Sequence, residues 1–231
     1  MIKAVLFDFD GTLADTAPDL GNALNRQRMD RGMPSLPIDL IRTEASSGAR
    51  GLLGMGFQIK PGDPDYEEMC TEFLNFYEER LCQDTILFPG VTELLQEIES
   101  RNLLWGIVTN KARRFIDPLL DQLGLSTRTD CVICGGDTAH FKPHPEPLLA
   151  AINILNVAPT ECIYLGDDIR DVEASLAAGI EPIVAMYGYL GNCGVAPESW
   201  GAKHLIENPQ DLLRHISVSY THLTLPTNRE V

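Results

Sequence analysis

Short runs of apolar residues, rich in Val, Ile and Leu, recur along the chain and alternate with longer segments of helical spacing. The apolar runs cover residues 2–7, 103–108, 131–134, 162–165 and 182–185. Each run predicts a strand that is buried on both faces, as the strands of a parallel sheet are. The segments 91–101, 113–123, 146–155 and 168–178 predict helices. The alternation therefore favours an α/β fold with a doubly wound parallel sheet.

The alternation stops between residues 16 and 87, where helical patterns at 18–31 and 66–81 occur without a convincing buried strand. We therefore expect a small all-α cap domain over residues 16–87, inserted after the first strand of a core domain that comprises residues 1–15 and 88–216. Such an insert would lie over the carboxyl ends of the strands, where ligands bind in open α/β sheets. Residues 217–231 show no period, and we expect a non-native or disordered tail there.

Composition excludes several classes of protein. The 231 residues carry a formal net charge of −15, which would repel a phosphate backbone, so no nucleic-acid partner is expected. No stretch approaches the roughly 20 apolar residues that a membrane span needs. The cysteines are too sparse for a disulfide-stapled secreted domain, and Cys131 and Cys134 indicate a buried strand rather than a zinc site. A soluble cytoplasmic protein without a membrane partner is predicted, with its oligomeric state left open.

Two carboxylates follow the first predicted strand, in the segment Asp8-Phe9-Asp10-Gly11-Thr12. Asp8 and Asp10 share one face of an extended chain, because side chains at i and i+2 point the same way. A divalent cation would remove their repulsion, and Mg²⁺ suits a site of carboxylate, carbonyl and phosphate oxygens. One carboxylate can then attack phosphorus, while the other protonates the leaving alcohol and later activates water. Gly11 permits the backbone to approach a phosphate closely.

Polar side chains also follow the strands predicted farther along the chain. Thr109 and Asn110 offer a hydroxyl and an amide to a transferring phosphoryl group. Lys142 precedes several prolines, which stiffen the approach to a helix and would aim its ammonium at the phosphate and the nucleophile. We expect the neighbouring His140 and His144 to be exposed loop residues rather than metal ligands or bases.

A second acidic segment, with Asp167, Asp168 and Asp171, comes directly after the fourth predicted strand. One of these acids can complete the metal site that the first pair begins. Asp168 is also explained as the cap of the next helix, since Asp is favoured at helix N-termini. Helix capping does not explain why polar residues follow the ends of several predicted strands of one sheet. The combination of these polar residues at one edge of the sheet indicates a catalytic site.

In chain order, the segments Asp8-Phe9-Asp10-Gly11-Thr12, Thr109-Asn110, Lys142-Pro143 and Gly166-Asp167 with Asp171 resemble the motifs of the haloacid dehalogenase superfamily. The resemblance spans about residues 1–216. It implies that Asp8 is the nucleophile and Asp10 the acid/base. It also implies that Asp8, the main-chain carbonyl of Asp10 and Asp167 hold Mg²⁺.

The same resemblance assigns the remaining residues of the motifs. Thr109 and Lys142 would bind the phosphate, with Asn110 near the site. The remaining acids of the last motif, Asp168 and Asp171, would surround the metal ligands and orient them.

The resemblance also narrows the reaction. Metal-free dehalogenases lack an acid at the position of Asp10, so its presence indicates phosphoryl chemistry. Phosphonate-cleaving relatives use a cap lysine, whereas Lys60 is the only lysine between Lys3 and Lys111 and lies outside the expected recognition loop. We expect a Mg²⁺-dependent phosphatase that hydrolyses a small phosphorylated metabolite through an aspartyl-phosphate. A sugar phosphomutase of the same fold and a non-catalytic phosphate-binding regulator are the alternatives.

Selectivity is expected in the cap segment 45–51, where Ser46, Ser47 and Arg50 offer donors to a carboxylate or a sugar. A plain helix start with an exposed arginine is the alternative interpretation. Over its length the chain is similar to bacterial phosphoglycolate phosphatases, and more closely to phosphatases that act on N-acetylmuramic acid 6-phosphate in cell-wall recycling. The segments 102–111 and 187–189 support the closer kinship. These substrates differ greatly in size, and the sequence leaves both open.

Overall fold

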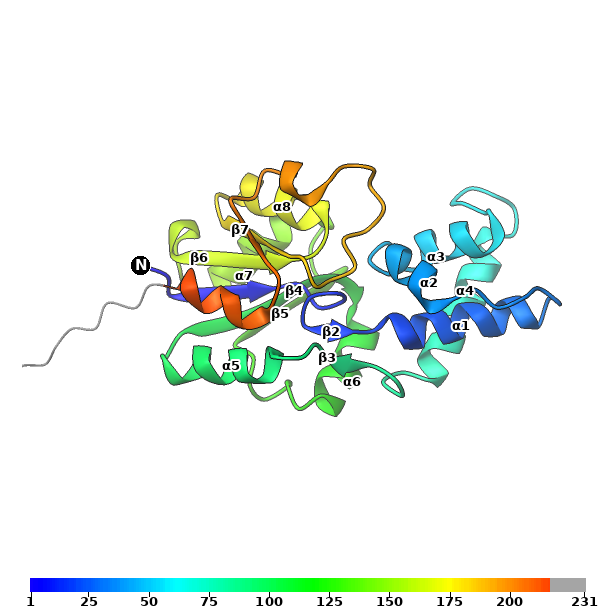
Figure 1. Ribbon diagram of the computed structural model, residues 1–231, viewed down its shortest axis with the longest axis horizontal. Helices are drawn as coiled ribbons and strands as arrows, with labels where there is room; N and C mark the ends of the chain where they lie inside the picture. Colours follow the sequence, from blue (N-terminus) through cyan, green and yellow to red (C-terminus); the bar gives the residue numbers. More distant parts are fainter. Residues whose placement is uncertain (217–231) are drawn as a thin grey trace, which may run out of the picture.

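A computed structural model describes residues 1–216 and shows a parallel sheet between two layers of helices, with a further group of helices at one end (Figure 1). The strands are β1 (Ala4–Phe7), β4 (Leu104–Ala112), β5 (Cys131–Gly135), β6 (Cys162–Gly166), β7 (Glu181–Ala185) and β8 (His204–Ile206). Their order is β5-β4-β1-β6-β7-β8, and every neighbouring pair is parallel. The predicted α/β fold is confirmed, and β8 is an additional strand at the edge. No helix of residues 1–216 combines the length and apolarity needed to cross a membrane.

Each face of the sheet has its own apolar core. The helices that cover the faces are α5 (Val91–Ser100), α6 (Arg113–Gln122), α7 (Glu146–Leu155) and α8 (Ile169–Ala178). In β1, Val5 and Phe7 pack with α5 and α6, whereas Ala4 and Leu6 pack with α7 and α8. Alternate residues of a strand point to opposite faces, so covering both faces requires the uninterrupted apolar run that the sequence shows.

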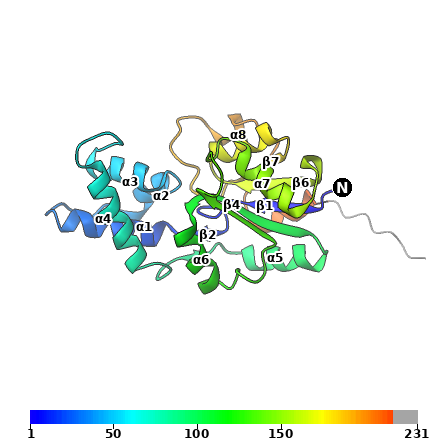
Figure 2. The same cartoon turned by 180° about the vertical axis from the view of Figure 1, so that it is seen from behind.

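The remaining helices, α1 (Ala17–Met29), α2 (Ile38–Ala45), α3 (Gly48–Phe57) and α4 (Tyr66–Glu79), lie together beyond one end of the sheet (Figures 1 and 2). The helical patterns at 18–31 and 66–81 correspond to α1 and α4. The helix α2 was not predicted, and the start of α3 was foreseen only as the alternative interpretation of segment 45–51. The four helices share an apolar core with residues such as Leu24, Ile41 and Phe73, all fully buried. Gly56 of α3 lies so close to α1 that a Cβ there would come within 2.7 Å of Leu24 Cδ1. The glycine-rich α3 is therefore stabilised by close packing rather than by helix propensity.

The chain leaves the sheet and returns to it through a short antiparallel pair, β2 (Ala14–Asp15) and β3 (Ile86–Leu87). Asp19 at the start of α1 is buried and accepts hydrogen bonds from the main-chain N–H and the hydroxyl of Thr85. On the other side of the pair, Arg42 of α2 donates to both carboxylate oxygens of Asp15 at 2.6 and 2.7 Å. Such a bidentate pair fixes orientation as well as distance. These contacts hold the helices over the carboxyl ends of the strands.

The tail predicted at residues 217–231 lies outside the residues that the structure describes.

Candidate active site

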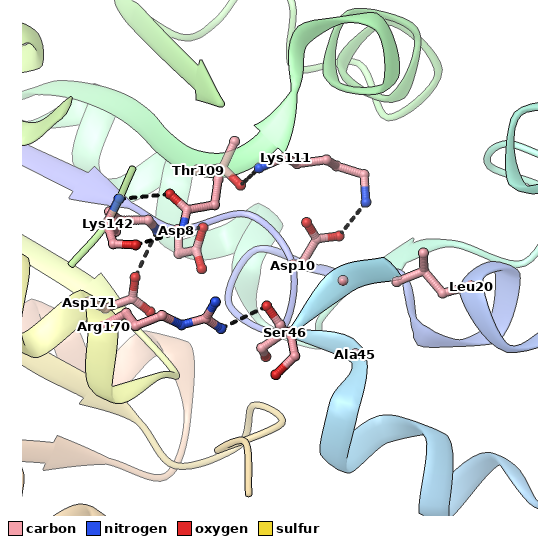
Figure 3. A pocket seen from close by; sticks show the side chains of 13 residues that line it. Asp8, Asp10, Leu20, Ala45, Ser46, Thr109, Lys111, Lys142, Arg170 and Asp171 are labelled. Carbon is pink, nitrogen blue, oxygen red and sulfur yellow. Dashed lines mark hydrogen bonds and ion pairs between the residues drawn. The ribbon is translucent and has the colours of Figure 1, made fainter. Parts of the chain in front are cut away.

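A cavity of about 160 Å³ lies where the carboxyl ends of the central strands meet α1–α4 (Figure 3). From the sheet and its loops it is lined by Asp8, Asp10, Thr109, Asn110, Lys111, Lys142, Arg170 and Asp171. From the helical group it is lined by Leu20, Ala45, Ser46, Ser47 and Gly48. Residues that stand far apart in the chain are thus brought into one small cavity, at the place where open α/β sheets bind ligands.

Three buried carboxylates lie side by side at this cavity. One oxygen from each of Asp8, Asp167 and Asp171 lies within 4.8 Å of the others. Burial raises the pKa of Asp8 to about 7. The ammonium of Lys142 lowers this pKa, whereas the nearby carboxylates of Asp171 and Asp10 raise it further. Burial, together with Asp8 and Asp171, holds the pKa of Asp167 well above its usual range. Crowded carboxylates of this kind favour a divalent cation with a preference for oxygen ligands, such as Mg²⁺.

Lys142 is the buried positive group beside these acids. Its Nζ lies 3.0 Å from Asp8 Oδ1 and 2.7 Å from Asp171 Oδ1. The ammonium also donates to the Tyr164 hydroxyl at 2.6 Å and to the main-chain carbonyl of Val108 at 2.9 Å. Burial lowers the pKa of Lys142, but the two carboxylates raise it by more, so the ammonium remains charged. Lys142 is therefore held in place and can attract an anion toward Asp8.

Asn110 lines the cavity and holds the main chain of Lys142 through both ends of its side-chain amide. Asn110 Nδ2 donates to the carbonyl of Lys142, and Asn110 Oδ1 accepts from the N–H of Lys142, both at 2.9 Å. Asn110 thus positions Lys142, and its contact with a phosphate stays a prediction. Its neighbour Thr109 is only 4% exposed and lines the cavity, where its hydroxyl oxygen accepts from the N–H of Lys111 at 3.2 Å.

The side chain of Asp10 stands apart from the three crowded acids. It accepts hydrogen bonds from the Thr16 hydroxyl and from Lys111 Nζ, the latter at 2.8 Å. Lys111 Nζ also lies 4.7 Å from the centre of the Tyr77 ring, which belongs to α4. Burial lowers the pKa of Lys111, but Asp10 and Tyr77 raise it by more, so the ammonium of Lys111 remains charged. Sequence reasoning missed Lys111, although its position directly after Asn110 was a usable signal.

Gly11 lies against Asp167 and is not among the residues that line the cavity, and its place beside a phosphate stays a prediction. Its φ of +83° suits glycine, and a Cβ there would come within 2.2 Å of Asp167 Oδ2. Asp167 accepts hydrogen bonds from the Thr12 hydroxyl at 3.0 Å and from the N–H of Tyr189 at 2.8 Å. The loop after β1 and the loop after β7 thereby fix the orientation of Asp167.

Asp168 caps α8 and is not one of the three crowded acids. Its carboxylate accepts from the N–H of Arg170 at 2.9 Å and from the guanidinium at 2.7 and 2.9 Å. Burial raises the pKa of Asp168, but Arg170 lowers it by more. Arg170 Nη2 also donates to the main-chain carbonyl of Ser46 at 2.7 Å, so this arginine joins the sheet side of the cavity to α2 (Figure 3). Arg170 was not predicted as a site residue.

The three predicted recognition residues of the cap lie at different distances from the acids. The Ser46 hydroxyl donates to Asp167 Oδ2 at 3.3 Å. Ser47 lines the 160 Å³ cavity and also a second cavity of about 600 Å³. Arg50 is exposed and lines only the second cavity. The structure therefore brings two of these residues to the catalytic groups and leaves Arg50 farther out.

His140 and His144 are exposed, as predicted, and their rings stack with centroids 4.1 Å apart. His140 Nδ1 lies 2.8 Å from Glu146 Oε2, and the three side chains form a group outside the catalytic cavity. Cys131 and Cys134 lie in β5 and are buried, in agreement with their assignment to a buried strand.

Comparison with known proteins gives consistent matches across the chain. The haloacid dehalogenase-like hydrolase family matches residues 5–185. The N-acetylmuramic acid 6-phosphate phosphatase of Pseudomonas putida is 40% identical over 93% of this chain and 96% of its own length. The phosphoglycolate phosphatase of Xanthomonas campestris is 42% identical over 91% of this chain and 94% of its own length. The crystal structure of a predicted phosphoglycolate phosphatase from Haemophilus somnus superimposes with a TM-score of 0.82 at 24% identity, over 93% of this chain and 97% of that one.

Proposed function

Because the chain belongs to the haloacid dehalogenase-like hydrolase family and is a phosphoric monoester hydrolase, we propose that it hydrolyses a small phosphorylated metabolite in a Mg²⁺-dependent reaction through Asp8. The observation that carries this proposal is the juxtaposition of Asp8 with a buried ammonium and two buried acids. Asp8 Oδ1 lies 3.0 Å from Lys142 Nζ, and its carboxylate neighbours those of Asp167 and Asp171. A carboxylate nucleophile needs positive charge beside it to approach a phosphate dianion; Lys142 and a cation held by the neighbouring acids would supply that charge.

Asp8 is the nucleophile in the proposed reaction. One of its oxygens forms a bond to phosphorus as the bond from phosphorus to the ester oxygen breaks, which gives an aspartyl-phosphate. Asp10 donates a proton to the departing alkoxide, and then accepts a proton from the water that attacks the phosphoryl group. Release of phosphate restores the Asp8 carboxylate. The Lys111 and Thr16 contacts support this role of Asp10, because they hold its carboxyl group at the edge of the cavity.

The oxygen atoms beside Asp8 fit a magnesium site. Asp8, Asp167 and the main-chain carbonyl of Asp10 would hold the ion, while Asp171 stays paired with Lys142. When bound, Mg²⁺ would neutralise the carboxylates and the transferring phosphoryl group. The raised pKa values of Asp8 and Asp167 support this assignment, because they reflect buried negative charge that lacks full compensation from the protein.

Lys142 and Thr109 are the proposed phosphate-binding residues. The ammonium of Lys142 lies beside Asp8 and can reach oxygens of a phosphoryl group attached there, and the Thr109 hydroxyl lines the same cavity. Asn110 is assigned a positioning role, since both ends of its amide bind the main chain of Lys142. Donors fixed in advance in this way stabilise charge that develops in the transition state.

The proposal is tested by phosphate release from p-nitrophenyl phosphate, 2-phosphoglycolate and N-acetylmuramic acid 6-phosphate by the purified protein. We expect turnover in the presence of Mg²⁺ and its loss in EDTA, with recovery when excess Mg²⁺ is added. Full activity after chelation would contradict the proposed magnesium site. Conversion of one hexose phosphate into another without phosphate release would instead support a phosphomutase.

A further inference from the structure

The second cavity adjoins the catalytic cavity on the side of α2 and α3. It has a volume of about 600 Å³, and the two cavities share Ser47 and Arg170 as lining residues. Its other walls come from α2, α3 and the loop that carries Asn192. A group that leaves the catalytic cavity between Ser47 and Arg170 would therefore enter this second space.

The volumes of the two cavities bear on the size of the substrate. Sites for small molecules usually have about 300–1,000 Å³. The catalytic cavity, at about 160 Å³, falls below this range and is bordered by Asp8, Asp10 and Lys142, so a phosphoryl group takes up much of it. A two-carbon ester would leave the second cavity vacant, whereas a sugar would extend into it. The combined space fits the larger leaving group.

The polar groups of the second cavity indicate which chemical class it binds. Arg50 is exposed on α3, and residues 1–216 supply no carboxylate that pairs with it. Arg170 uses Nε and Nη2 on Asp168 and Ser46, while its Nη1 has no acceptor within the described chain. Guanidinium groups with unused donors are suited to a carboxylate.

The remaining polar side chains of the second cavity suit a sugar. Thr43 and Ser47 provide hydroxyls, Glu44 a carboxylate and Asn192 an amide. These groups can exchange hydrogen bonds with sugar hydroxyls and with an amide substituent. The second cavity is lined by two arginines, Arg50 and Arg170, and by one acid, Glu44. The excess of one positive charge suits a leaving group with a single negative charge.

We propose that the second cavity is a leaving-group subsite for a phosphorylated sugar that carries a carboxylate, and that Arg50 and Arg170 Nη1 bind this carboxylate. The inference rests on the proposed phosphatase function and specifies its substrate class. It selects an acidic sugar phosphate over 2-phosphoglycolate as the substrate. Sequence identity does not distinguish these substrates, because the chain is 40% identical to an N-acetylmuramic acid 6-phosphate phosphatase and 42% identical to a phosphoglycolate phosphatase.

The test compares kcat/KM for N-acetylmuramic acid 6-phosphate and N-acetylglucosamine 6-phosphate, which share the amino sugar and differ in the lactyl carboxylate. We expect the wild-type protein to favour the acidic sugar phosphate at least about tenfold, the scale of one charge-assisted hydrogen bond. Arg50→Gln should remove most of this preference, so that the ratio of the two kcat/KM values falls about tenfold. Arg80→Gln is the matched control, because Arg80 is another exposed arginine of the helical group and lies outside both cavities.

A second variant tests the volume of the subsite without touching its charge. A Cβ at Gly54 meets only the carbonyl of Ile59 at 3.7 Å, so Gly54→Leu is accommodated by the helix and extends into the second cavity. We expect it to lower kcat/KM for both sugar phosphates relative to 2-phosphoglycolate.

The outcomes separate the subsite from the phosphatase proposal. Equal kcat/KM for the two sugar phosphates, together with no change of their ratio in Arg50→Gln, would overturn the subsite while leaving phosphatase activity intact. Absence of phosphate release from every ester, p-nitrophenyl phosphate included, would overturn the proposed function itself.

Discussion

The two sides of the catalytic cavity are built differently. On the sheet side, Asp8, Lys142 and Asp171 are 8%, 4% and 2% exposed, and each takes part in an ion pair. On the side of α2 and α3, Ser46 is half-buried and Arg50 is exposed. Buried charges that lose a partner are costly, whereas half-exposed donors can be exchanged at small cost. The difference suggests that the sheet side fixes the chemistry and the helical side adjusts to the leaving group.

The largest effect is expected from Asp8→Asn, which tests whether the chemistry depends on the sheet side. The amide keeps the shape of the carboxylate but cannot form the aspartyl-phosphate, so kcat should fall by about 10⁴-fold or more. Steady-state phosphate release measures the loss, and circular dichroism checks the fold. Asp121→Asn is the matched control, because Asp121 is an exposed acid of α6. Wild-type turnover in purified Asp8→Asn would refute the mechanism.

Lys142→Met should have the next largest effect and should reduce both activity and stability. Removal of the ammonium leaves Asp8 and Asp171 without their cation, so we expect a destabilisation of about 3 kcal/mol. Loss of the donor at the phosphoryl group should lower kcat by about 10²- to 10³-fold. Urea unfolding and kinetics measure the two effects, with the exposed Lys203→Met as control. A variant as stable as the wild type would show that the acids do not need this lysine.

The crowding of the acids also predicts how metal-free protein responds to pH. The pKa of Asp8 is raised from 3.8 to about 7 in the folded chain, so the folded state binds more protons than the unfolded state between these values. The resulting stability is fully present below pH 3.8 and is lost as the pH rises through about 7. In EDTA, Tm should therefore fall by about 2–5 °C between pH 5 and pH 8.

Two comparisons isolate the contribution of Asp8 to this pH dependence. The fall in Tm should be smaller in Asp8→Asn, because that variant has no carboxyl group to titrate at this position. Mg²⁺ should raise the Tm of the wild type more at pH 8 than at pH 5, since it binds the ionised acids. A Tm that rises between pH 5 and pH 8 in EDTA, in the wild type but not in the variant, would contradict the assigned shift.

The sequence predicted the sheet better than it predicted the helices above it. A strand buried on both faces needs a continuous apolar run, so β1 and the other predicted strands were evident. β8 has only three residues and lies at the edge, which leaves it little apolar signal. The helix α3 contains Gly48, Gly51, Gly54 and Gly56. Its formation depends on close packing against α1, and local propensity does not report such packing.

For the site, the acids and Lys142 could be predicted, whereas their partners could not. Tyr164 occupies a buried strand and resembles any aromatic strand residue, although its hydroxyl accepts from Lys142 Nζ at 2.6 Å. Arg170 follows an acidic helix start, where nothing local indicates a bond to the carbonyl of Ser46. Asn110 was assigned to the phosphate because amides are suitable donors, and its contact with the main chain of Lys142 was not foreseen. Such contacts join segments distant in the chain and arise only on folding.

The smallest effect is expected from Ser46→Ala, and it gives the strictest test of the difference between the two sides. The Ser46 hydroxyl donates to Asp167 at 3.3 Å, but Asp167 also accepts from Thr12 and from the N–H of Tyr189 at shorter distances. Loss of one neutral donor should lower kcat/KM by about 2- to 10-fold. Tm should stay unchanged, because Ser46 is half-buried and its carbonyl still accepts from Arg170.

The companion variant Thr12→Ala removes a donor to the same carboxylate from the sheet side. Thr12 is fully buried, so its loss leaves Asp167 Oδ1 without the hydroxyl and should lower both kcat/KM and Tm by more than Ser46→Ala does. Kinetics and thermal unfolding of both variants compare how much a donor from the sheet side and a donor from the helical side contribute at the same acceptor, the Asp167 carboxylate. If Ser46→Ala proves as damaging as Thr12→Ala, the helical side takes part in fixing the chemistry, and the division of roles drawn from burial is wrong.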